Sequence, residues 1–429
     1  MANRAGRAAS IFLIAGVTLG VGGCRGRGEA HVRAVPGGPP EHVANIDRLS
    51  ALQRLTTGLR DPIRVELPAG TYTLAGVPFR TPTCSTCPNP AVVVHGTYGL
   101  RLSGHGIRLV GASAETVTLS TDAGCGILFE DCRDCSVENV TITGGKRDGD
   151  PNAADAAIAC VRSSVRISRC ILSDNLGKPS PRLPIDVGIG GVVVRDSSTV
   201  ELDSCTLSRN SGDGVAVFSG SSASVRGSIV DGVDRGQGPD LPGGRGVGLA
   251  AYQDGRLVAE GTLVTRYLRG ARLLGGGGLE ARRCAFEEIT GPGIEMNDLG
   301  SLMPVAIVED SAIVVTGACG ARLLRSAPAP LGGAPPGAFR RNAIVLTGQN
   351  PAMDSPDVFC RQVALDLASV PDGFVIEDNV YFANREDGGG PGREDSPPDV
   401  FRRAIAPLLE EMRKEPALAG SRFLRDFGK

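Results

Sequence analysis

A short phrase recurs along the middle of the chain and limits the folds open to it. A small residue, usually Gly, is followed by three or four mostly apolar residues, as in GILF from 126, AIACV from 157, GVVV from 191 and GVAVF from 214. The phrase returns as GLAAY from 248, GARLL from 270, GIEM from 293 and GARLL from 320. These segments are short and rich in β-branched residues with period-two alternation, so each predicts a short strand.

A second phrase follows each strand at a nearly fixed distance, as in SVENVTI, TVELDSCTL and GLEARRCAF. The distances from the small residue are 14, 13, 14, 14, 13, 14, 18 and 22 residues if the following positions are equivalent: Val140, Cys170, Cys205, Ser228, Gly261, Cys284, Ser311 and Asn342. Strands that recur every 23 to 35 residues, with no helix-length segment between them, predict a solenoid of parallel strands. In this solenoid Asp213 is expected to close a tight turn without a second, paired aspartate, and Cys205 to share an inward column with Cys170 and Cys284.

Several phrases carry a resemblance to a known family. IRVELPAGTYTL at 63–74, GHGIRLVGAS at 104–113 and VENVTITGG at 137–145 are similar to the opening of right-handed parallel β-helix proteins related to pectate lyases. NVYFANRED and KEPALAGSRF resemble the closing segment of that family, so the resemblance covers residues 43–429. It implies an all-β fold, a single-stranded right-handed parallel β-helix solenoid. It implies little about chemistry, because this fold hosts many activities.

The first 23 residues have the pattern of an export signal. Arg4 and Arg7 precede the apolar run IFLIAGVTLGV, which is too short to span a membrane, and small residues follow. The sequence VGGC ending at Cys24 resembles the bacterial lipoprotein signal, which implies that Cys24 is lipidated; ordinary cleavage nearby with a free Cys24 is the alternative. Residues 24–42 are expected to form a flexible tether.

The β-helix domain is expected at 43–385, and both of its ends require a cover because they expose unpaired strand edges. The spacing of Val43, Ile46, Leu49 and Leu52 predicts a short N-terminal capping helix. After a linker at 386–398, a C-terminal helical cap is expected at 399–429, with Asp399 as its N-cap and Pro407 as a kink or break. Its apolar stripe comprises Val400, Phe401, Ala404, Ile405, Leu408, Leu409 and Met412.

Twelve cysteines in an exported chain suggest disulfides. Several fall on repeated strands, which predicts buried, reduced thiols at Cys160, Cys170, Cys205 and Cys284. The CxxC pairs Cys84/Cys87 and Cys132/Cys135 predict bridges or free thiols, with a zinc site that includes His95 or His105 as the alternative. Cys319 and Cys360 each lie just before a repeated strand, so their Cα separation can suit a disulfide, and the sequence leaves the pairing open.

Three insertions interrupt the repeat at the same point of the coil, in residues 143–157, 173–190 and 231–248. Insertions at one recurring position project from one edge of a solenoid and wall a groove along it. Their mixed charges suit an extended polysaccharide, including an acidic one, although solvated loops hold charges in any protein. The candidate substrate-binding residues are Lys178, Asp186, Arg235 and Arg245.

If the protein is an enzyme, the resemblance implies a polysaccharide lyase, in which a base removes the proton beside a uronate carboxylate that a cation neutralises. The candidate catalytic residues are Lys146, Arg147 and Arg182. The candidate calcium ligands are Asp148, Asp150 and Asp155, the densest acidic group. The family signatures are incomplete: RLP from 182 has Val187 where a second Arg belongs, and GHG at 104–106 precedes Asp213 instead of following it, so His105 is expected to be a turn residue.

Arg272, Glu295 and Arg322 occupy the same repeat position and predict an Arg-Glu-Arg ladder on an exposed sheet face. An exposed ladder of this kind relieves like-charge stacking and contributes little to stability. A ligand-binding strip is the alternative.

The formal net charge of −2 provides no basic surface for nucleic acid. We therefore expect an exported monomer, anchored to a membrane of the cell envelope through Cys24, that binds extended glycans or partner proteins without catalysis. A calcium-assisted polysaccharide lyase that uses the groove of the insertions is the first alternative. Delivery of a metal to periplasmic enzymes is the second, and the chain lacks the His or Met clusters that it would need.

Overall fold

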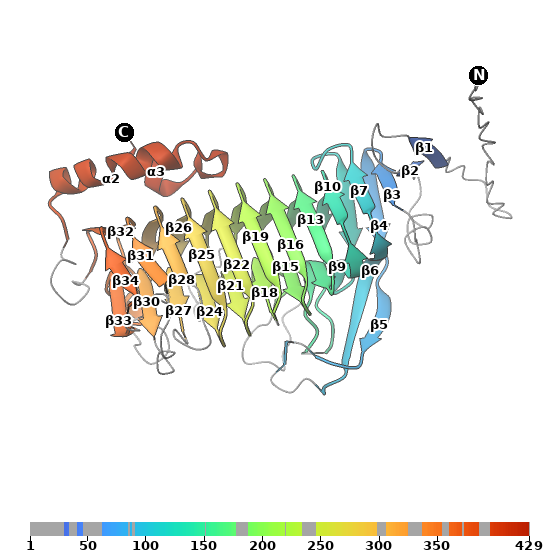
Figure 1. Cartoon of the computed structure of the whole chain (residues 1–429), viewed down its shortest axis with the longest axis horizontal. Helices are drawn as coiled ribbons and strands as arrows, with labels where there is room; N and C mark the ends of the chain where they lie inside the picture. Colours follow the sequence, from blue (N-terminus) through green and yellow to red (C-terminus); the bar gives the residue numbers. More distant parts are fainter. Residues whose placement is uncertain are drawn as a thin grey trace, which may run out of the picture.

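The computed structural model describes residues 30–33, 41–45, 62–84, 86–87, 91–150, 152–176, 188–218, 220–233, 246–297, 306–324, 337–353, 360–370, 373–385 and 395–428. Within these ranges the strands form three long sheets, and almost every strand pairs in parallel with the strands one coil before and one coil after it. Figure 1 shows the strands stacked as a row from the N-terminal (blue) to the C-terminal (red) end. The solenoid predicted from the repeat is confirmed.

Each coil passes through the three sheets in the order A, C, B. Sheet A contains β1 Ala30–Arg33, β2 Glu41–Asn45, β3 Ile63–Leu67, β7 Ile107–Gly111, β10 Cys135–Glu138, β13 Ser164–Ser168, β16 Thr199–Asp203, β19 Ser222–Arg226, β22 Arg256–Glu260, β25 Gly278–Arg282, β28 Ala306–Glu309, β31 Gly337–Arg340 and β34 Val375–Glu377. Sheet C contains β4 Gly70–Leu74, β8 Val117–Thr121, β11 Thr141–Thr143, β14 Ile171–Ser173, β17 Thr206–Ser208, β20 Ile229–Asp231, β23 Leu263–Thr265, β26 Ala285–Ile289, β29 Ala312–Thr316, β32 Ala343–Val345 and β35 Val380–Phe382. Sheet B contains β5 Val77–Thr81, β6 Val94–His105, β9 Cys125–Arg133, β12 Ala156–Val161, β15 Gly190–Arg195, β18 Val215–Val217, β21 Val247–Tyr252, β24 Arg269–Leu274, β27 Ile294–Met296, β30 Ala321–Leu324 and β33 Leu365–Ser369. The pairs β1–β2 and β5–β6 are antiparallel, and a short 3-10 helix, η1, spans Pro351–Met353.

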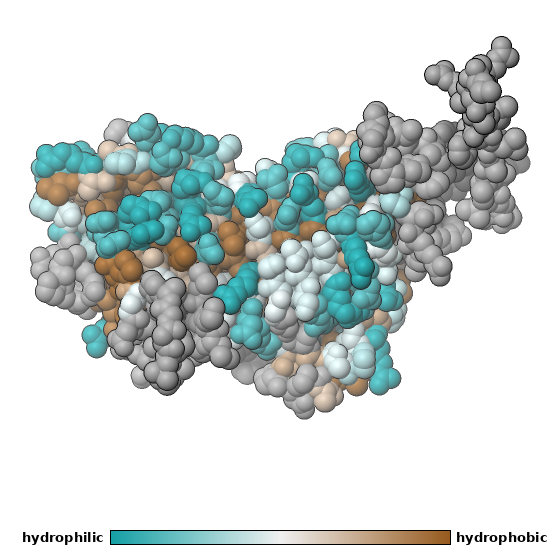
Figure 2. Space-filling model, in the orientation of Figure 1, coloured by the Kyte–Doolittle hydropathy of each residue, from teal (hydrophilic) through white to brown (hydrophobic). Residues whose placement is uncertain are grey.

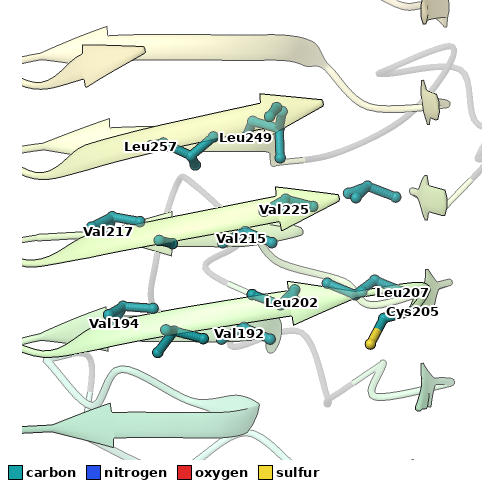
Figure 3. Packing of buried hydrophobic residues seen from close by; sticks show 14 of the residues in the cluster. Val192, Val194, Leu202, Cys205, Leu207, Val215, Val217, Val225, Leu249 and Leu257 are labelled. Atoms are coloured by element: carbon teal, nitrogen blue, oxygen red, sulfur yellow. The ribbon is translucent and has the colours of Figure 1, made fainter. Parts of the chain in front are cut away.

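The core fills the space between the three sheets. On β16, Val200 and Leu202 are buried while Thr199, Glu201 and Asp203 are exposed, which is the period-two pattern expected of a strand with one inward face. Figure 3 shows inward side chains of neighbouring coils lying over one another in rows. Burial of a large aliphatic side chain contributes about 1.5–3 kcal/mol, so the stacked rows are the main source of stability.

Glycine at the start of the sheet B strands has a steric cause. A Cβ atom on Gly214 would lie 2.5 Å from the carbonyl oxygen of Gly248, and one on Gly248 would lie 2.7 Å from that of Gly270. The same approach recurs at Gly293, whose Cβ would lie 2.5 Å from the oxygen of Gly320. On these coils the chain turns so closely against the next coil that only a residue without a side chain fits without displacement. Ala157 occupies the equivalent position on β12, so the corner accepts a methyl group on that coil.

An inward column lies between sheets A and C, where the sequence predicts it. Cys170, Cys205 and Cys284 each directly precede strands that pair in register, and all three are buried. The predicted equivalence of Gly261 is wrong by one residue, because Leu263 pairs with Ile229 and so places Thr262 in the column. The Thr262 hydroxyl donates to the Val225 and Glu260 carbonyls, so this column accepts small polar side chains as well as cysteine.

The N-terminal helix predicted from Val43 does not begin there, because Val43 lies on β2 and pairs with β3 of the solenoid. A strand at this position extends sheet A by one rung, so backbone pairing replaces the expected helical face. Ile46, Leu49 and Leu52, which complete that pattern, lie outside the described residues, as do the signal segment and Cys24. In the part of the chain that the structure describes, no helix is long and apolar enough to cross a membrane.

The C-terminal segment folds into α2 Pro398–Met412, the 3-10 helix η2 Pro416–Leu418 and α3 Arg422–Phe427. The N-cap of α2 is Pro397, with Asp399 in the first turn, and the helix continues through Pro407. The buried stripe packs on the outer face of sheet C, from Leu263 to Val345, and does not simply close the last coil. Figure 1 shows α2 and α3 lying along the side of the C-terminal half, and Figure 2 shows mostly hydrophilic residues on their outward surface.

A buried carboxylate fixes α3 to this sheet. Glu287 of β26 accepts hydrogen bonds from the backbone N–H groups of Arg422 and Phe423 at 2.7 and 2.8 Å. These amides belong to the first turn of the helix and have no partner within it, so the carboxylate satisfies both. Burial raises the pKa of Glu287.

The cysteine predictions are largely confirmed. Disulfides join Cys84 to Cys87 and Cys319 to Cys360, and the first of these removes two ligands from the alternative zinc site. The free thiols in the described ranges are all buried: Cys125, Cys132, Cys135, Cys160, Cys170, Cys205 and Cys284.

Candidate functional site

The insertions leave the solenoid between sheet C and sheet B, as the sequence predicts. They connect β11 to β12, β14 to β15 and β20 to β21. Their described ends line a cavity of about 470 Å³ over the outer face of sheet B, with Asn152 to Asp155 on one side and Gly246 and Val247 on another. The groove expected from the insertions therefore has a counterpart on this sheet.

The floor of the cavity is made of small side chains. The outward positions Val193 and Ala216 lie on successive coils, and glycine occupies positions 188, 190, 212 and 246 along the rim. Side chains of this size leave the surface of the sheet shallow, so a ligand can lie across several strands at close range to the backbone.

Two aromatic rings stand beside this floor. Phe218 directly follows β18, and Tyr252 ends β21 on the next coil. Their ring centroids are 4.9 Å apart with planes inclined by 35°, and both rings are half-buried cavity-lining groups. Aromatic rings offer an apolar face against which the C–H face of a sugar ring can pack.

Asp213 lies at the same rim and has two hydrogen-bond partners. Its carboxylate accepts a hydrogen bond of 2.8 Å from the Val247 N–H and one of 3.4 Å from the Tyr252 hydroxyl. Burial raises the pKa of Asp213, although these hydrogen bonds and the positive charges of Arg272 and Arg269 act in the opposite direction. Burial and the charge of Asp213 raise the pKa of Tyr252, so this phenol is a proton donor at neutral pH.

Two arginines close the C-terminal end of the cavity and share one carboxylate. Glu295 Oε2 lies 2.5 Å from Arg269 Nε and 3.2 Å from Arg272 Nε. The predicted register of Arg272, Glu295 and Arg322 is confirmed, but the expected exposure is wrong: the Glu295 side chain is 3% exposed. Arg269 causes the difference, since it comes from another position of the repeat and covers the carboxylate. Arg272 is 28% exposed and lines the cavity.

The candidate catalytic residues that the structure describes do not meet in this cavity. Arg147 is enclosed, because its guanidinium binds the Asp155 carboxylate and the Ala153 carbonyl and its side chain is 4% exposed. Lys146 is exposed and lies 3.9 Å from Asp122. In this arrangement Arg147 holds the 143–157 segment together and does not face the place of a substrate.

The three candidate calcium ligands have separate partners. Asp148 accepts hydrogen bonds from the Thr97 N–H and hydroxyl, both at 2.7 Å, and Asp150 accepts one from the His95 N–H at 2.8 Å. Asp155 accepts from Arg147 and from the Asp148 N–H, and burial raises its pKa to about 7. Across the described ranges, no group of three or more His, Cys, Asp or Glu side chains is arranged to hold a metal ion.

Lys178, Arg182, Asp186, Arg235 and Arg245 lie outside the described residues, and their roles stay predictions. Phe218, Tyr252 and Arg269 line the cavity and were not among the residues predicted from the sequence. A signal for the two aromatic residues was present, because each stands four residues after the small residue of its strand phrase, in GVAVF and GLAAY. Arg269 precedes its phrase, and only the fold shows that it reaches Glu295.

Three stacked parallel sheets, with a cavity over one of them, define the class of parallel β-helix proteins. A family model described as right handed beta helix region matches residues 98–238 and 156–329, which together span 98–329, or 232 of the 429 residues. The chain belongs to this family. No curated protein matches the sequence.

Solved structures with a similar chain path are distant in sequence. A mannuronic acid specific polysaccharide family 6 lyase from human gut microbiota is 10% identical, with a TM-score of 0.39 over 90% of this chain and 98% of the lyase. A pectate lyase from a Bacillus species in complex with trigalacturonate is 10% identical, with a TM-score of 0.38 over 83% and 86% of the two chains. An alginate lyase from a Paenibacillus species is 12% identical, with a TM-score of 0.34 over 80% and 88%. At this distance no site residue is transferred from them.

Proposed function

We propose that the protein binds an extended, acidic glycan across the outer face of sheet B, without catalysis. The observation that carries the proposal is the combination, in one open cavity, of a floor of small residues, the Phe218–Tyr252 pair and the Arg272 guanidinium. An extended glycan can lie along stacked coils because both repeat in one direction. The rings would pack against sugar faces, and the exposed part of Arg272 would bind a uronate carboxylate.

The insertions would form the walls of this site. Asp148 and Asp150 accept hydrogen bonds from backbone N–H groups of β6, and these bonds hold the 143–157 segment in place as one wall. We further propose that Lys178, Asp186, Arg235 and Arg245 contact the glycan from the two other insertions. The other class of ligand that could bind in this cavity is a partner protein of the cell envelope.

Calorimetric titration with oligogalacturonate, oligomannuronate and a neutral cello-oligosaccharide tests this function. Binding of an acidic oligomer, weakened about tenfold or more by Arg272→Gln, is expected because a hydrogen bond to a charged group contributes about 1.5–3 kcal/mol. Phe218→Leu should also weaken binding, since it removes the ring but keeps an apolar side chain. The matched control is Arg166→Gln on the outer face of sheet A, where Arg166 pairs with Glu201. Equal affinity for acidic and neutral oligomers, or loss of binding in the control, would overturn the assignment.

A polysaccharide lyase remains the second candidate, favoured by the contact between Tyr252 and Asp213 beside two arginines. In this scheme Asp213 removes the proton beside the uronate carboxylate, the glycosidic C–O bond breaks, and Tyr252 protonates the leaving oxygen. The products are an unsaturated uronyl end and a new reducing end, without net oxidation. Ultraviolet absorbance of that end, with and without calcium, follows the reaction. Activity that Tyr252→Phe abolishes, while calorimetry shows retained binding, would make the protein an enzyme.

We also propose that the protein is an exported monomer held to a membrane of the cell envelope by a lipid on Cys24. The support is the signal-like sequence that ends in VGGC. Labelled fatty acid should enter the wild-type protein and not the Cys24→Ser variant, and the variant should move from the membrane fraction to the soluble fraction. Membrane association of the unlabelled variant would contradict the anchor.

A further inference from the structure

Two thiols meet at a turn of the solenoid that the proposed site does not use. Cys132 ends the inward part of β9, and Cys135 begins β10 on sheet A. Asp134 between them has a φ of 53°, at the corner where the chain passes from sheet B to sheet A. Cys132 is 0% exposed and Cys135 is 2% exposed, and both belong to the main core.

The two thiols lie against the same stretch of β6. Cys132 Sγ donates to the Leu102 carbonyl at 3.1 Å, and Cys135 Sγ lies 3.7 Å from the Gly104 carbonyl, two residues further along β6. The thiols also hydrogen-bond each other, which raises the pKa of Cys132 and lowers the pKa of Cys135.

The chain itself indicates the redox conditions under which it folds. Cys84 and Cys87, with the same spacing of three residues, are joined by a disulfide across a Cα–Cα distance of 5.4 Å. Cys319 and Cys360 are joined across 5.9 Å. Structural disulfides form and persist in oxidising surroundings, so the other thiols of this chain are exposed to oxidants while it folds.

Cys170 and Cys205 lie in register on neighbouring coils, and their geometry differs from that of Cys132 and Cys135. Parallel strands hold their side chains at the strand spacing of about 4.8 Å, whereas the Cβ atoms of a disulfide lie about 3.8 Å apart. Hydrogen-bonded ladders on both sides oppose that approach. Cys132 and Cys135 lie on either side of a turn instead, where small dihedral changes bring two side chains together.

We propose that Cys132 and Cys135 are oxidised to a third disulfide while the chain folds, closing the turn between β9 and β10. The Cys135 thiolate attacks one sulfur of a donor disulfide, carried by an oxidase or by oxidised glutathione, and displaces the other donor sulfur as a thiolate. The Cys132 thiolate then attacks Cys135 Sγ in the mixed disulfide and displaces the remaining donor thiolate. Two cysteine thiols are oxidised, one donor disulfide is reduced to two thiols, and the cysteine protons pass to the donor thiolates.

The position of Arg133 makes the bond easy to detect. Trypsin cleaves after Arg108, Arg133 and Lys146, so the two cysteines fall on separate peptides, residues 109–133 and 134–146. The full chain is produced with a periplasmic export signal, denatured in iodoacetamide without reductant, digested and analysed by mass spectrometry. The expected result is a linked pair of these two peptides that carries one alkyl group, on Cys125, and separates on reduction.

The same sample holds its own controls. Cys84–Cys87 and Cys319–Cys360 should be recovered oxidised, which shows that the protein met an oxidant, and Cys170, Cys205 and Cys284 should be alkylated. Alkylation of both Cys132 and Cys135 in a sample where the two other disulfides are complete would overturn the proposal. A link from residue 132 or 135 to any other cysteine would overturn it as well. In the Cys135→Ser variant, peptide 134–146 should be free and Cys132 alkylated.

Discussion

At the residue scale, the candidate site depends on charges that the fold brings together from different coils. Glu295 is nearly inaccessible because Arg269 and Arg272, both on the preceding strand of sheet B, cover it. A buried carboxylate with two guanidinium partners is stable only while both signs of charge are present, since either one alone would be desolvated without compensation. The row of Arg272, Glu295 and Arg322 therefore contributes more to stability than the exposed ladder predicted from the sequence would.

Replacing Glu295 by Gln should destabilise the protein by about 3 kcal/mol, because two partly buried guanidinium groups lose their counter-charge. Urea unfolding, monitored by circular dichroism, gives the free energy of unfolding. The matched control is Glu201→Gln, whose partner Arg166 is 65% exposed on sheet A, and little change is expected there. Equal effects of the two substitutions would show that burial does not decide the strength of these pairs.

Asp155 should give the free energy of unfolding a measurable pH dependence. Its pKa rises from the ordinary 3.8 to about 7, because burial outweighs the Arg147 pair. At pH values between 3.8 and about 7, Asp155 is protonated in the folded protein and ionised in the unfolded chain. This contribution to stability is complete below pH 3.8 and is lost as the pH rises through about 7, by at most about 1.4 kcal/mol per pH unit.

The Asp155→Asn variant lacks this titration. Urea unfolding of both proteins at several pH values from about 4 to 8 should show the wild type losing stability relative to the variant up to about pH 7 and no further change above it. A constant difference across the range would mean that Asp155 keeps the same pKa in the folded and unfolded chains.

At the scale of elements, the C-terminal helices act as a cover for one sheet. The outer face of sheet C under α2 is apolar, and Ala312, Val314 and Val345 belong to the same buried cluster as Phe401 and Ile405. Phe401 also stacks on Phe382 of β35, with ring centroids 4.7 Å apart. An amphipathic helix alone would be marginal in water, so its stability comes from this docking.

Phe401→Ala should therefore cost about 3–5 kcal/mol, the range for removal of a buried aromatic side chain. The neighbouring residue provides the control, because Val400 is 41% exposed, and Val400→Ala should change the free energy of unfolding by less than about 0.5 kcal/mol. Thermal unfolding of the three proteins measures both values. A small effect at Phe401 would mean that α2 does not contribute to the stability of the solenoid.

At the scale of the whole molecule, the spacing of the coils depends on the glycine corner at the entry to sheet B. Each coil contacts only its neighbours, so stability is close to a sum of coil and interface contributions. A side chain that pushes two coils apart at this corner weakens the interface along the whole coil, because each coil pairs with its neighbour in all three sheets.

Gly248→Ala should lower the free energy of unfolding by about 1–3 kcal/mol through overpacking, since the new Cβ meets the Gly270 carbonyl at 2.7 Å and Val264 Cγ1 at 2.3 Å. Gly149→Ala is the control, because nothing lies within 4 Å of the place of its Cβ. Differential scanning calorimetry compares the two variants with the wild type. Equal midpoints for both would refute the steric explanation of the glycine column.

The parallel β-helix, the positions of the strand starts and the cysteine column could be predicted from the sequence alone, whereas the bridge between Cys319 and Cys360 was one arrangement that the sequence allowed and the structure shows. These features were predictable because they repeat and because strand periodicity, glycine sterics and small-residue stacking act between residues at fixed spacings. Val43 shows the limit, since apolar spacing alone does not tell a short helix from an added strand. Gly261 shows another, because a one-residue shift in a turn leaves the local pattern almost unchanged.

The set of residues that share the cavity follows from the folded chain and not from the sequence pattern. Asp213, Tyr252 and Arg269 line the cavity from three successive coils of sheet B, and Glu295, which binds Arg269, lies on the next coil. The four residues are up to 82 residues apart in the sequence. Their contacts depend on side-chain reach across coils, which no local pattern encodes. The same holds for the C-terminal helices: their apolar stripe was evident in the sequence, but the face that it covers depends on the apolar surface that the folded sheet C presents.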